Sequence, residues 1–159
     1  MSIRTLSEQE VNQAVHDALQ THGYGRDELI PVLQDVNNQL GYLPTLAIVK
    51  LSQMMKIPTS QVYSVASFYS MLSTEARGEH IVQFCESAPC HVMGGRQVWN
   101  TLLETLGIRP GETSPDGKWT LITTSCLGIC GVGPVMIVDD EVYGNLTPQR
   151  TRDILAQIA

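Results

Sequence analysis

The hydrophobic pattern of this 159-residue chain changes its period once, near residue 73, and this change limits the folds that the chain can adopt. Before that point apolar residues recur at helical spacing, and after it several apolar runs have the length and residue types of β-strands. A chain of this length can hold a small helical unit joined to a domain of about 80 residues. We therefore predict an α+β chain, with a helical bundle over residues 1–75 and a sheet-containing domain over residues 76–159.

The first half is predicted to contain four short helices. Ser7 and Glu10 form a capping box, and the apolar residues that follow recur at helical spacing as far as Gly23. The same pattern, interrupted by glycine and proline, predicts further helices over residues 27–40 and 45–56. Thr59 or Ser60 can cap a fourth helix that runs to about Met71.

The second half is predicted to contain a small sheet flanked by helices. Extended apolar runs cover residues 80–84, 119–124 and 135–138, and Asp139 with Asp140 forms a tight turn into a short hairpin partner. Helical spacing recurs over residues 94–106. It recurs again after Thr147, where a cap is followed by proline at the first helical position. The resulting order of strands and helices, β-α-β-β-α, fits a small sheet flanked by helices.

The composition excludes two classes of partner. The net charge is −6 and the ten Lys and Arg residues are scattered, whereas nucleic-acid binding needs clustered positive charge. The N-terminal sequence has no apolar signal-peptide stretch, and no window approaches the roughly 20 apolar residues that span a bilayer. We therefore expect a cytoplasmic protein without direct membrane insertion. Charged residues make up only 16% of the chain, which favours burial against protein partners.

All four cysteines lie in the second half, as the pairs Cys85-x4-Cys90 and Cys126-x3-Cys130. The first pair begins directly after one predicted strand and the second pair begins just after another. Neighbouring strands could therefore bring both loops to one point. In a reducing compartment, cysteines in this arrangement are typical of a metal or cluster site rather than of structural disulfides.

The spacing favours a 2Fe-2S cluster over the alternatives. Structural zinc commonly uses C-x2-C, and wider pairs with adjacent glycines better suit two irons and N–H groups that point at sulfur. Two disulfides and a zinc site stay open as alternatives, whereas a thiol-disulfide enzyme would normally show C-x-x-C. His91 could bind iron in principle, but four cysteines already complete the ligand set. A Rieske-type site needs paired Cys and His motifs that the chain lacks.

Motifs for substrate chemistry are missing from the sequence. There is no Ser-His-Asp set, paired-carboxylate motif, P-loop or G-x-G-x-x-G. The remaining histidines, His16, His22 and His80, are interpreted as surface or hydrogen-bonded residues. We therefore expect no catalysis by the chain alone.

Two cysteine motifs and several helical motifs together resemble a known family. The segments CESAPCHVMG at residues 85–94 and CLGIC at residues 126–130 match the cysteine motifs of the small 2Fe-2S, thioredoxin-like subunit of complex I and related NAD-linked complexes in type, spacing and order. The helical half matches as well, in LIPVLQ at residues 29–34, GYLP at 41–44, IP at 57–58 and VYSVASFY at 62–69. The resemblance extends from about Asp27 to Ile158. Ile129 and residues 87–89 depart from the usual pattern without altering a cysteine.

The resemblance implies a fold, a cofactor and partners. It implies an N-terminal helical bundle followed by a thioredoxin-like ferredoxin domain, with Cys85, Cys90, Cys126 and Cys130 as ligands of one 2Fe-2S cluster. It also implies a partner subunit that carries FMN and an NAD(P) site, further Fe-S subunits, and single-electron exchange with that flavin. Complex I, on the cytoplasmic side of a membrane, formate dehydrogenase and bifurcating hydrogenases all fit. A free ferredoxin and a zinc-stabilised interaction module are the alternatives.

Overall fold

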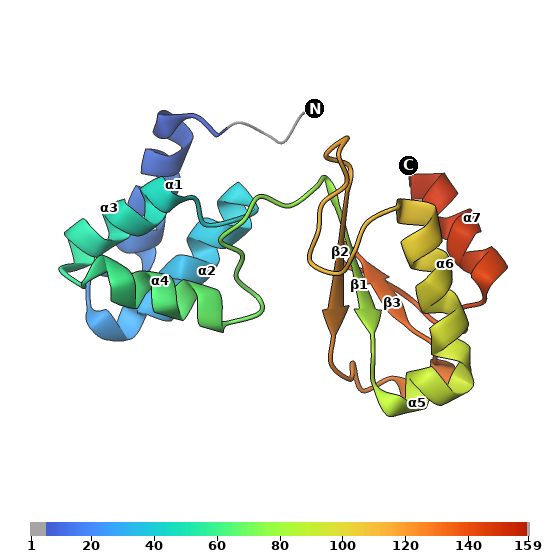
Figure 1. Cartoon of the computed structure of the whole chain (residues 1–159). Coiled ribbons are helices and arrows are strands. Elements are labelled where there is room, and N and C mark those ends of the chain that lie inside the picture. Colours follow the sequence, from blue (N-terminus) through green and yellow to red (C-terminus); the bar gives the residue numbers. More distant parts are fainter. Residues whose placement is uncertain (1–5, 159) are drawn as a thin grey trace. The chain divides into compact units, whose positions relative to one another are not determined.

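The computed structural model describes residues 6–158. These residues form two compact units, and the boundary between them along the chain falls between Ala76 and Arg77. Each unit is described by itself (Figure 1). Residues 1–5 and 159, which the predicted domains include, lie outside the described residues. The first unit is helical and the second combines helices with a sheet, as the α+β prediction requires.

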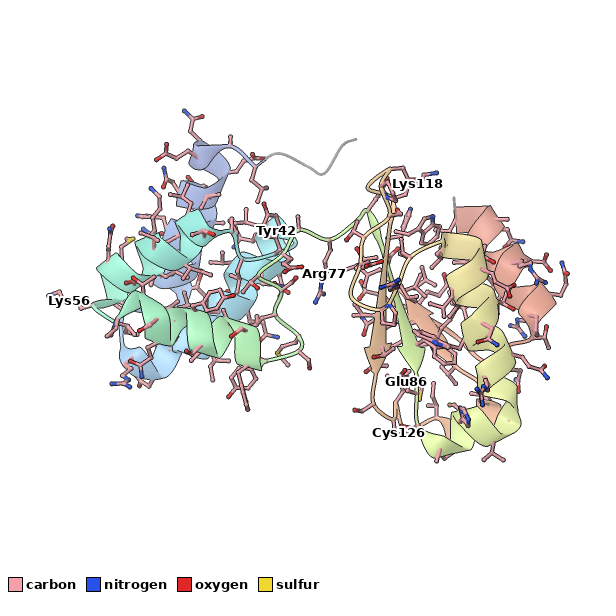
Figure 2. The ribbon with its side chains drawn as sticks, viewed as in Figure 1. Tyr42, Lys56, Arg77, Glu86, Lys118 and Cys126 are labelled. Carbon is pink, nitrogen blue, oxygen red and sulfur yellow. The ribbon has the colours of Figure 1, made fainter. Side chains whose placement is uncertain are left out.

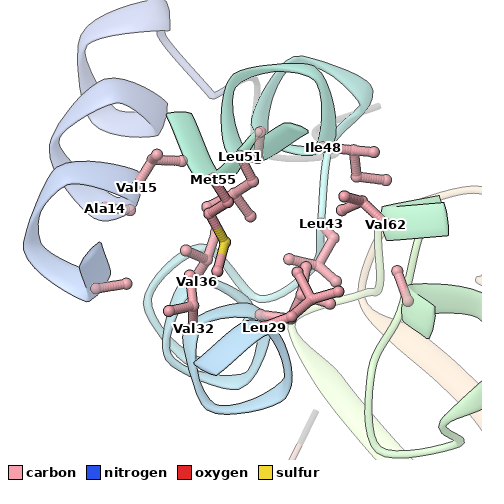
Figure 3. Close-up of a cluster of buried hydrophobic side chains, with 14 of the residues drawn as sticks. Ala14, Val15, Leu29, Val32, Val36, Leu43, Ile48, Leu51, Met55 and Val62 are labelled. Carbon is pink, nitrogen blue, oxygen red and sulfur yellow. The ribbon is translucent and has the colours of Figure 1, made fainter. Parts of the chain in front are cut away.

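The first unit packs its helices around one apolar core. The helices are α1 (Glu8–His22), a short 3-10 turn η1 (Arg26–Glu28), α2 (Leu29–Leu40), α3 (Thr45–Met55) and α4 (Thr59–Phe68). The predicted capping box of α1 is present, because the Glu10 N–H donates to Ser7 Oγ and the Ser7 N–H donates to the Glu10 carboxylate. Figure 3 shows side chains from α1 to α4 meeting in this core.

Three predicted helix boundaries in this unit are wrong. The segment Arg26–Glu28 forms a 3-10 turn, so that α2 begins at Leu29 rather than at Asp27. α4 has Pro58 as its N-cap, and the Thr59 hydroxyl pairs with the buried Ser52 hydroxyl at 2.8 Å instead of capping the helix. α4 ends at Phe68 because Tyr69 has extended backbone angles.

The end of the first unit is held by hydrogen bonds to α2 and to the turn after it. The buried Asn37 side chain on α2 accepts a hydrogen bond from the Ser73 N–H at 3.0 Å. The Ser73 carbonyl accepts one from the Leu43 N–H at 2.7 Å. The polar connector predicted after residue 72 is therefore fixed at its beginning.

The second unit is built on a four-stranded sheet with the order β2-β1-β3-β4. Its strands are β1 (His80–Cys85), β2 (Trp119–Thr124), β3 (Met136–Val138) and β4 (Glu141–Tyr143). β1 pairs in parallel with β2 and antiparallel with β3, and β3 and β4 form the predicted hairpin around Asp139. β1 is therefore hydrogen-bonded along both of its edges.

Helices α6 (Arg96–Leu106) and α7 (Pro148–Ile158) lie side by side on the sheet (Figure 1). Alternate residues of β1, Val82 and Phe84, are buried in one cluster with Val98 and Leu102 of α6 and with apolar residues of α7. Three short elements complete the unit, and all lie next to cysteines: α5 (Ala88–Cys90), η2 (His91–Gly95) and η3 (Cys130–Val132).

Candidate metal centre

The cysteine loops leave the sheet at the same end. Cys85 is the last residue of β1 and pairs in register with Thr124, the last residue of β2, and Cys126 follows two positions later. Since the carboxyl ends of parallel strands share one edge of a sheet, both loops start from adjacent points. Figure 2 shows Glu86 and Cys126 at this end of the second unit, close to α5.

The first loop turns Cys90 back into the unit interior. Ser87 begins the short helix α5, and the His91 N–H donates to the Ser87 carbonyl at 3.0 Å. A wide turn follows, in which Gly94 has a φ of +99° that side-chain-bearing residues rarely adopt. At Gly95 an added Cβ would lie 2.6 Å from the Cys90 carbonyl oxygen, so that only glycine allows this close approach.

The second loop brings its own two cysteines together. Cys126 Sγ and Cys130 Sγ are 3.4 Å apart, and the Gly128 N–H donates to Cys126 Sγ at 3.4 Å. Gly128 has a φ of +81°, which turns its N–H toward the sulfur. Further along, a Cβ added at Gly133 would lie 3.4 Å from Cys90 Sγ and 3.3 Å from the Cys130 carbonyl oxygen. The second loop therefore passes directly over the first cysteine pair.

Cys85 is the cysteine with the most hydrogen-bond donors around its sulfur. Burial raises the pKa of the Cys85 thiol, but the Ser87 N–H, the Cys90 thiol and the Leu127 N–H outweigh burial and leave the pKa below its ordinary value. Because Leu127 belongs to the second loop, that loop also contacts the first pair. The site therefore favours a thiolate at Cys85.

The other thiols of the site respond to negative charge on their neighbours. Burial, then hydrogen bonding and repulsion from Cys85, raise the pKa of Cys90. Hydrogen bonding to Cys126, followed by burial and by repulsion from Cys126 and Cys85, raises the pKa of Cys130. Neighbouring thiolates repel one another, so that a positively charged group between the four cysteines would stabilise the thiolate form of all four.

The two pairs differ in exposure. Cys85 and Cys90 are each 1% exposed and pack with Val135 and Leu127. Cys126 is exposed and Cys130 is half-buried, and all four are free thiols. A group held by both pairs would therefore have one end in the interior of the unit and the other end at its surface.

The four cysteines are grouped in two pairs, an arrangement that suits a cluster with two metal atoms. Four thiolates around zinc all lie about 2.3 Å from one point. The sulfurs are instead grouped two by two, with Cys85 beside Cys90 and Cys126 beside Cys130. Two pairs of thiolates are the ligand set of a 2Fe-2S cluster.

The structure also shows an open cavity beside Cys85 that the sequence analysis did not predict. Its volume is about 470 Å³, and its lining residues come from the end of β1, the first loop and α6: Phe84, Cys85, Glu86, His91, Gly95, Arg96, Trp99 and Asn100. His91 is exposed in its wall, and the rings of Phe84 and Trp99 lie 5.3 Å apart. The helical spacing of Arg96, Trp99 and Asn100 directly after the cysteine loop is the sequence signal that could have indicated it.

Across residues 6–158, none of the helices has the length and apolar character needed to cross a membrane.

Comparisons with known proteins show which family the chain belongs to. The family model of the thioredoxin-like [2Fe-2S] ferredoxin matches residues 15–159. A subunit of the NADH-quinone oxidoreductase of Salmonella typhimurium is 35% identical over 150 residues, which cover 92% of this chain and 90% of that protein. The NADP-reducing hydrogenase subunit HndA of Solidesulfovibrio fructosivorans is 33% identical over 93% of this chain and 84% of its own length.

A solved structure shares the fold. The crystal structure of an NAD+-reducing [NiFe]-hydrogenase in the H2-reduced state superposes with a TM-score of 0.69 at 21% identity, over 79% of this chain and 22% of the hydrogenase chain. The family model matches most of the chain, and the relatives match it nearly end to end. The chain therefore belongs to the family of thioredoxin-like [2Fe-2S] ferredoxins.

Proposed function

We propose that this chain is an electron-transfer subunit that binds one 2Fe-2S cluster and exchanges single electrons with the FMN of a partner flavoprotein. In this proposal Cys85 and Cys90 hold one iron, and Cys126 and Cys130 hold the other. The observation that carries the proposal is the meeting of two separate cysteine pairs at one end of the parallel strands β1 and β2. When bound, the cluster supplies a site that accepts and returns one electron.

The surrounding residues have the roles that such a cluster needs. The buried pair, Cys85 and Cys90, keeps water away from one side of the site. The N–H groups of Ser87, Leu127 and Gly128 point at sulfur and stabilise negative charge on it. The proposed role is redox transfer, without catalysis by the chain alone.

The surface around the second pair supports a protein partner. Apolar side chains of both cysteine loops are exposed there: Val92 is 84% exposed, and Met93, Ile129 and Val132 are between 39% and 49% exposed. We refer to these four residues as the apolar rim. An uncharged rim favours a lasting contact between proteins, whereas a free ferredoxin that moves between enzymes would use a charged docking patch.

The relatives indicate which partners to expect. Their names describe subunits of NADH-quinone oxidoreductase and of an NADP-reducing hydrogenase. We propose by analogy a flavoprotein partner with FMN and an NAD(P) site, together with further Fe-S subunits. We also propose a cytoplasmic location, where the reducing environment keeps the four thiols available.

The test begins with anaerobic EPR spectra of the purified chain, oxidised and dithionite-reduced, with iron, sulfide and zinc measured on the same sample. A reduced S = 1/2 signal with about two irons and two sulfides per chain supports the cluster. NADH should reduce it only after an FMN-containing, NADH-oxidising protein is added. Zinc without iron would reject the redox role, and reduction by NADH alone would reject the need for a flavoprotein.

A further inference from the structure

We propose that Cys126 and Cys130 form an intramolecular disulfide when the chain, freed of its cluster, meets a small disulfide such as oxidised glutathione, while Cys85 and Cys90 remain thiols. The chemistry requires only the four free cysteines. Its consequence for cluster assembly rests on the proposed function, because it assumes that all four cysteines are ligands.

Exposure selects the second pair, and the two sulfurs of that pair already lie close together. Cys126 Sγ and Cys130 Sγ are 3.4 Å apart, and a disulfide needs them at about 2.05 Å. The backbone around the pair has room to close this gap, because Cβ atoms added at Gly128, between the two cysteines, and at Gly131, directly after Cys130, would meet nothing within 4 Å. Cys126 is exposed to an incoming molecule and Cys130 is half-buried beside it.

The first pair is protected from the same reagent. Cys85 borders the open cavity but, like Cys90, is only 1% exposed, and Gly133 of the second loop lies over Cys90. A thiolate attacks a disulfide along the S–S axis, and the bulk of glutathione requires open space around the attacking sulfur. Burial therefore makes this pair react far more slowly than the exposed pair.

The reaction proceeds in two balanced steps. The Cys126 thiolate attacks one sulfur of glutathione disulfide, the S–S bond breaks, and one glutathione thiolate leaves. The Cys130 thiolate then attacks Cys126 Sγ, breaks the mixed disulfide and releases the second glutathione. Two protein thiols are oxidised by two electrons, one glutathione disulfide is reduced to two thiols, and the protons of the protein thiols pass to them. Because the second step is intramolecular, the mixed disulfide is short-lived.

The disulfide would control cluster assembly. It removes two of the four proposed ligands at once, and a dithiol reductant restores them by the reverse exchange. The chain could therefore receive a cluster only when its exposed pair is reduced.

The experiment uses the full-length chain after anaerobic removal of iron with a chelator and reductant. It is treated with oxidised glutathione, its free thiols are alkylated in denaturant, and trypsin peptides are weighed. Cleavage after Arg77, Arg96, Lys118 and Arg150 puts the first pair on one peptide and the second pair on another. We expect the second peptide unalkylated and lighter by two hydrogen atoms, and the first peptide carrying two alkyl groups.

Two variants separate the steps. Cys130→Ser keeps the exposed attacking thiol and should retain one glutathione on Cys126. Cys126→Ser should acquire glutathione much more slowly, because only the half-buried thiol remains. A disulfide in the first peptide, equal reaction of all four thiols, or a stable glutathione adduct on the unaltered chain would overturn the proposal.

Reassembly with iron and sulfide gives an independent readout. When the cluster-free chain is oxidised before iron and sulfide are added, no cluster should assemble and the reduced sample should give no EPR signal. Treatment of the oxidised chain with dithiothreitol before reassembly should restore the signal in full. Assembly of a full cluster on the chain that carries the disulfide would show that the disulfide does not prevent cluster assembly. If the untreated chain binds no 2Fe-2S cluster, the proposed function fails, but the peptide masses still decide whether the disulfide forms.

Discussion

Cys85 and Thr124 are paired on the last rung of the parallel ladder between β1 and β2. Only Ser125 separates Thr124 from Cys126. The backbone pairing of two strands therefore fixes the starting points of both cysteine loops, before any metal contributes to the arrangement.

Replacing Cys126 tests the ligand assignment. We expect Cys126→Ala to lose the 2Fe-2S cluster, because one iron would be left with a single protein sulfur, whereas Cys126→Ser could retain a weakened cluster through oxygen. Iron, sulfide and the reduced EPR signal measure the result. Ser125→Ala, in the same loop, is the matched control and should bind a full cluster. A full cluster in Cys126→Ala would remove Cys126 from the ligand set.

Replacing Gly128 tests the hydrogen bond to Cys126. Alanine disfavours the φ of +81° at this position by roughly 1–2 kcal/mol, so that the N–H should turn away from the sulfur. Loss of about 1 kcal/mol of stabilisation in the reduced form lowers a one-electron potential by about 40 mV. Redox titration followed by EPR measures this shift.

The control for this prediction is Gly131→Ala. Gly131 lies in the same loop, its φ is not in the left-handed region, and an added Cβ would meet nothing within 4 Å. The reduction potential of the cluster in Gly131→Ala should equal that in the unaltered chain. Equal shifts in both variants would show that the Gly128 N–H has no special effect on the cluster.

Replacing Gly95 tests the packing of the first loop. A Cβ at Gly95 would lie 2.6 Å from the Cys90 carbonyl oxygen, and backbone at this distance must move. We expect Gly95→Ala to lower the free energy of unfolding by roughly 1–3 kcal/mol, as overpacked sites do, and to lower cluster content as well. Urea unfolding of both forms, with Gly131→Ala as the control, provides the measurement. An unchanged midpoint would mean that the loop accommodates the methyl group without cost.

Replacing Ser52 tests whether the first unit can be destabilised without affecting the proposed cluster in the second unit. The buried Ser52 hydroxyl donates to the Ile57 carbonyl at 2.8 Å and pairs with the Thr59 hydroxyl. Ser52→Ala leaves these groups without that partner and should destabilise the first unit by about 1–2 kcal/mol. Thermal unfolding by circular dichroism measures the loss, and the exposed Ser60→Ala is the control. The EPR signal should not change, and a changed signal would show that the cluster depends on this core.

Expressing residues 76–159 without the helical unit tests the proposed domains, 1–75 and 76–159. The second unit has its own apolar core and contains all four cysteines. We therefore expect this fragment to fold and to bind a full 2Fe-2S cluster. EPR and iron analysis would show it, and an insoluble or cluster-free fragment would favour a single cooperative domain.

The sequence predicted the parts of the fold that local patterns determine. The capping box at Ser7, the stop at Gly23 and the proline at the start of α7 are encoded by neighbouring residues, and each lies where the sequence predicted it. The end of α4 and the role of Thr59 could not be predicted in the same way. Thr59 turns to Ser52, which lies seven positions away on another helix, and such a contact leaves no periodic signal.

At the site, too, some features could be predicted from local sequence and others depend on contacts between distant segments. The adjacency of the two cysteine loops followed from strands that end at cysteines, and the parallel pairing of β1 with β2 confirms it. The position of β3 on the other edge of β1, and the passage of Gly133 over Cys90, depend on contacts between distant segments. So does the difference in exposure between the two cysteine pairs, because identical residue types with similar spacing carry no mark of burial.

The pairing of β1 on both edges has a consequence for how the site would fail on heating. Cys85 is carried by the strand that pairs along both of its edges, whereas the loop from Cys126 to Cys130 lies outside the strands and meets the first cysteine pair through Leu127. Segments with few backbone hydrogen bonds open at lower free energy than the interior of a sheet. Release of iron should therefore begin as a local opening of this loop, and colour should be lost at temperatures where the sheet is still folded.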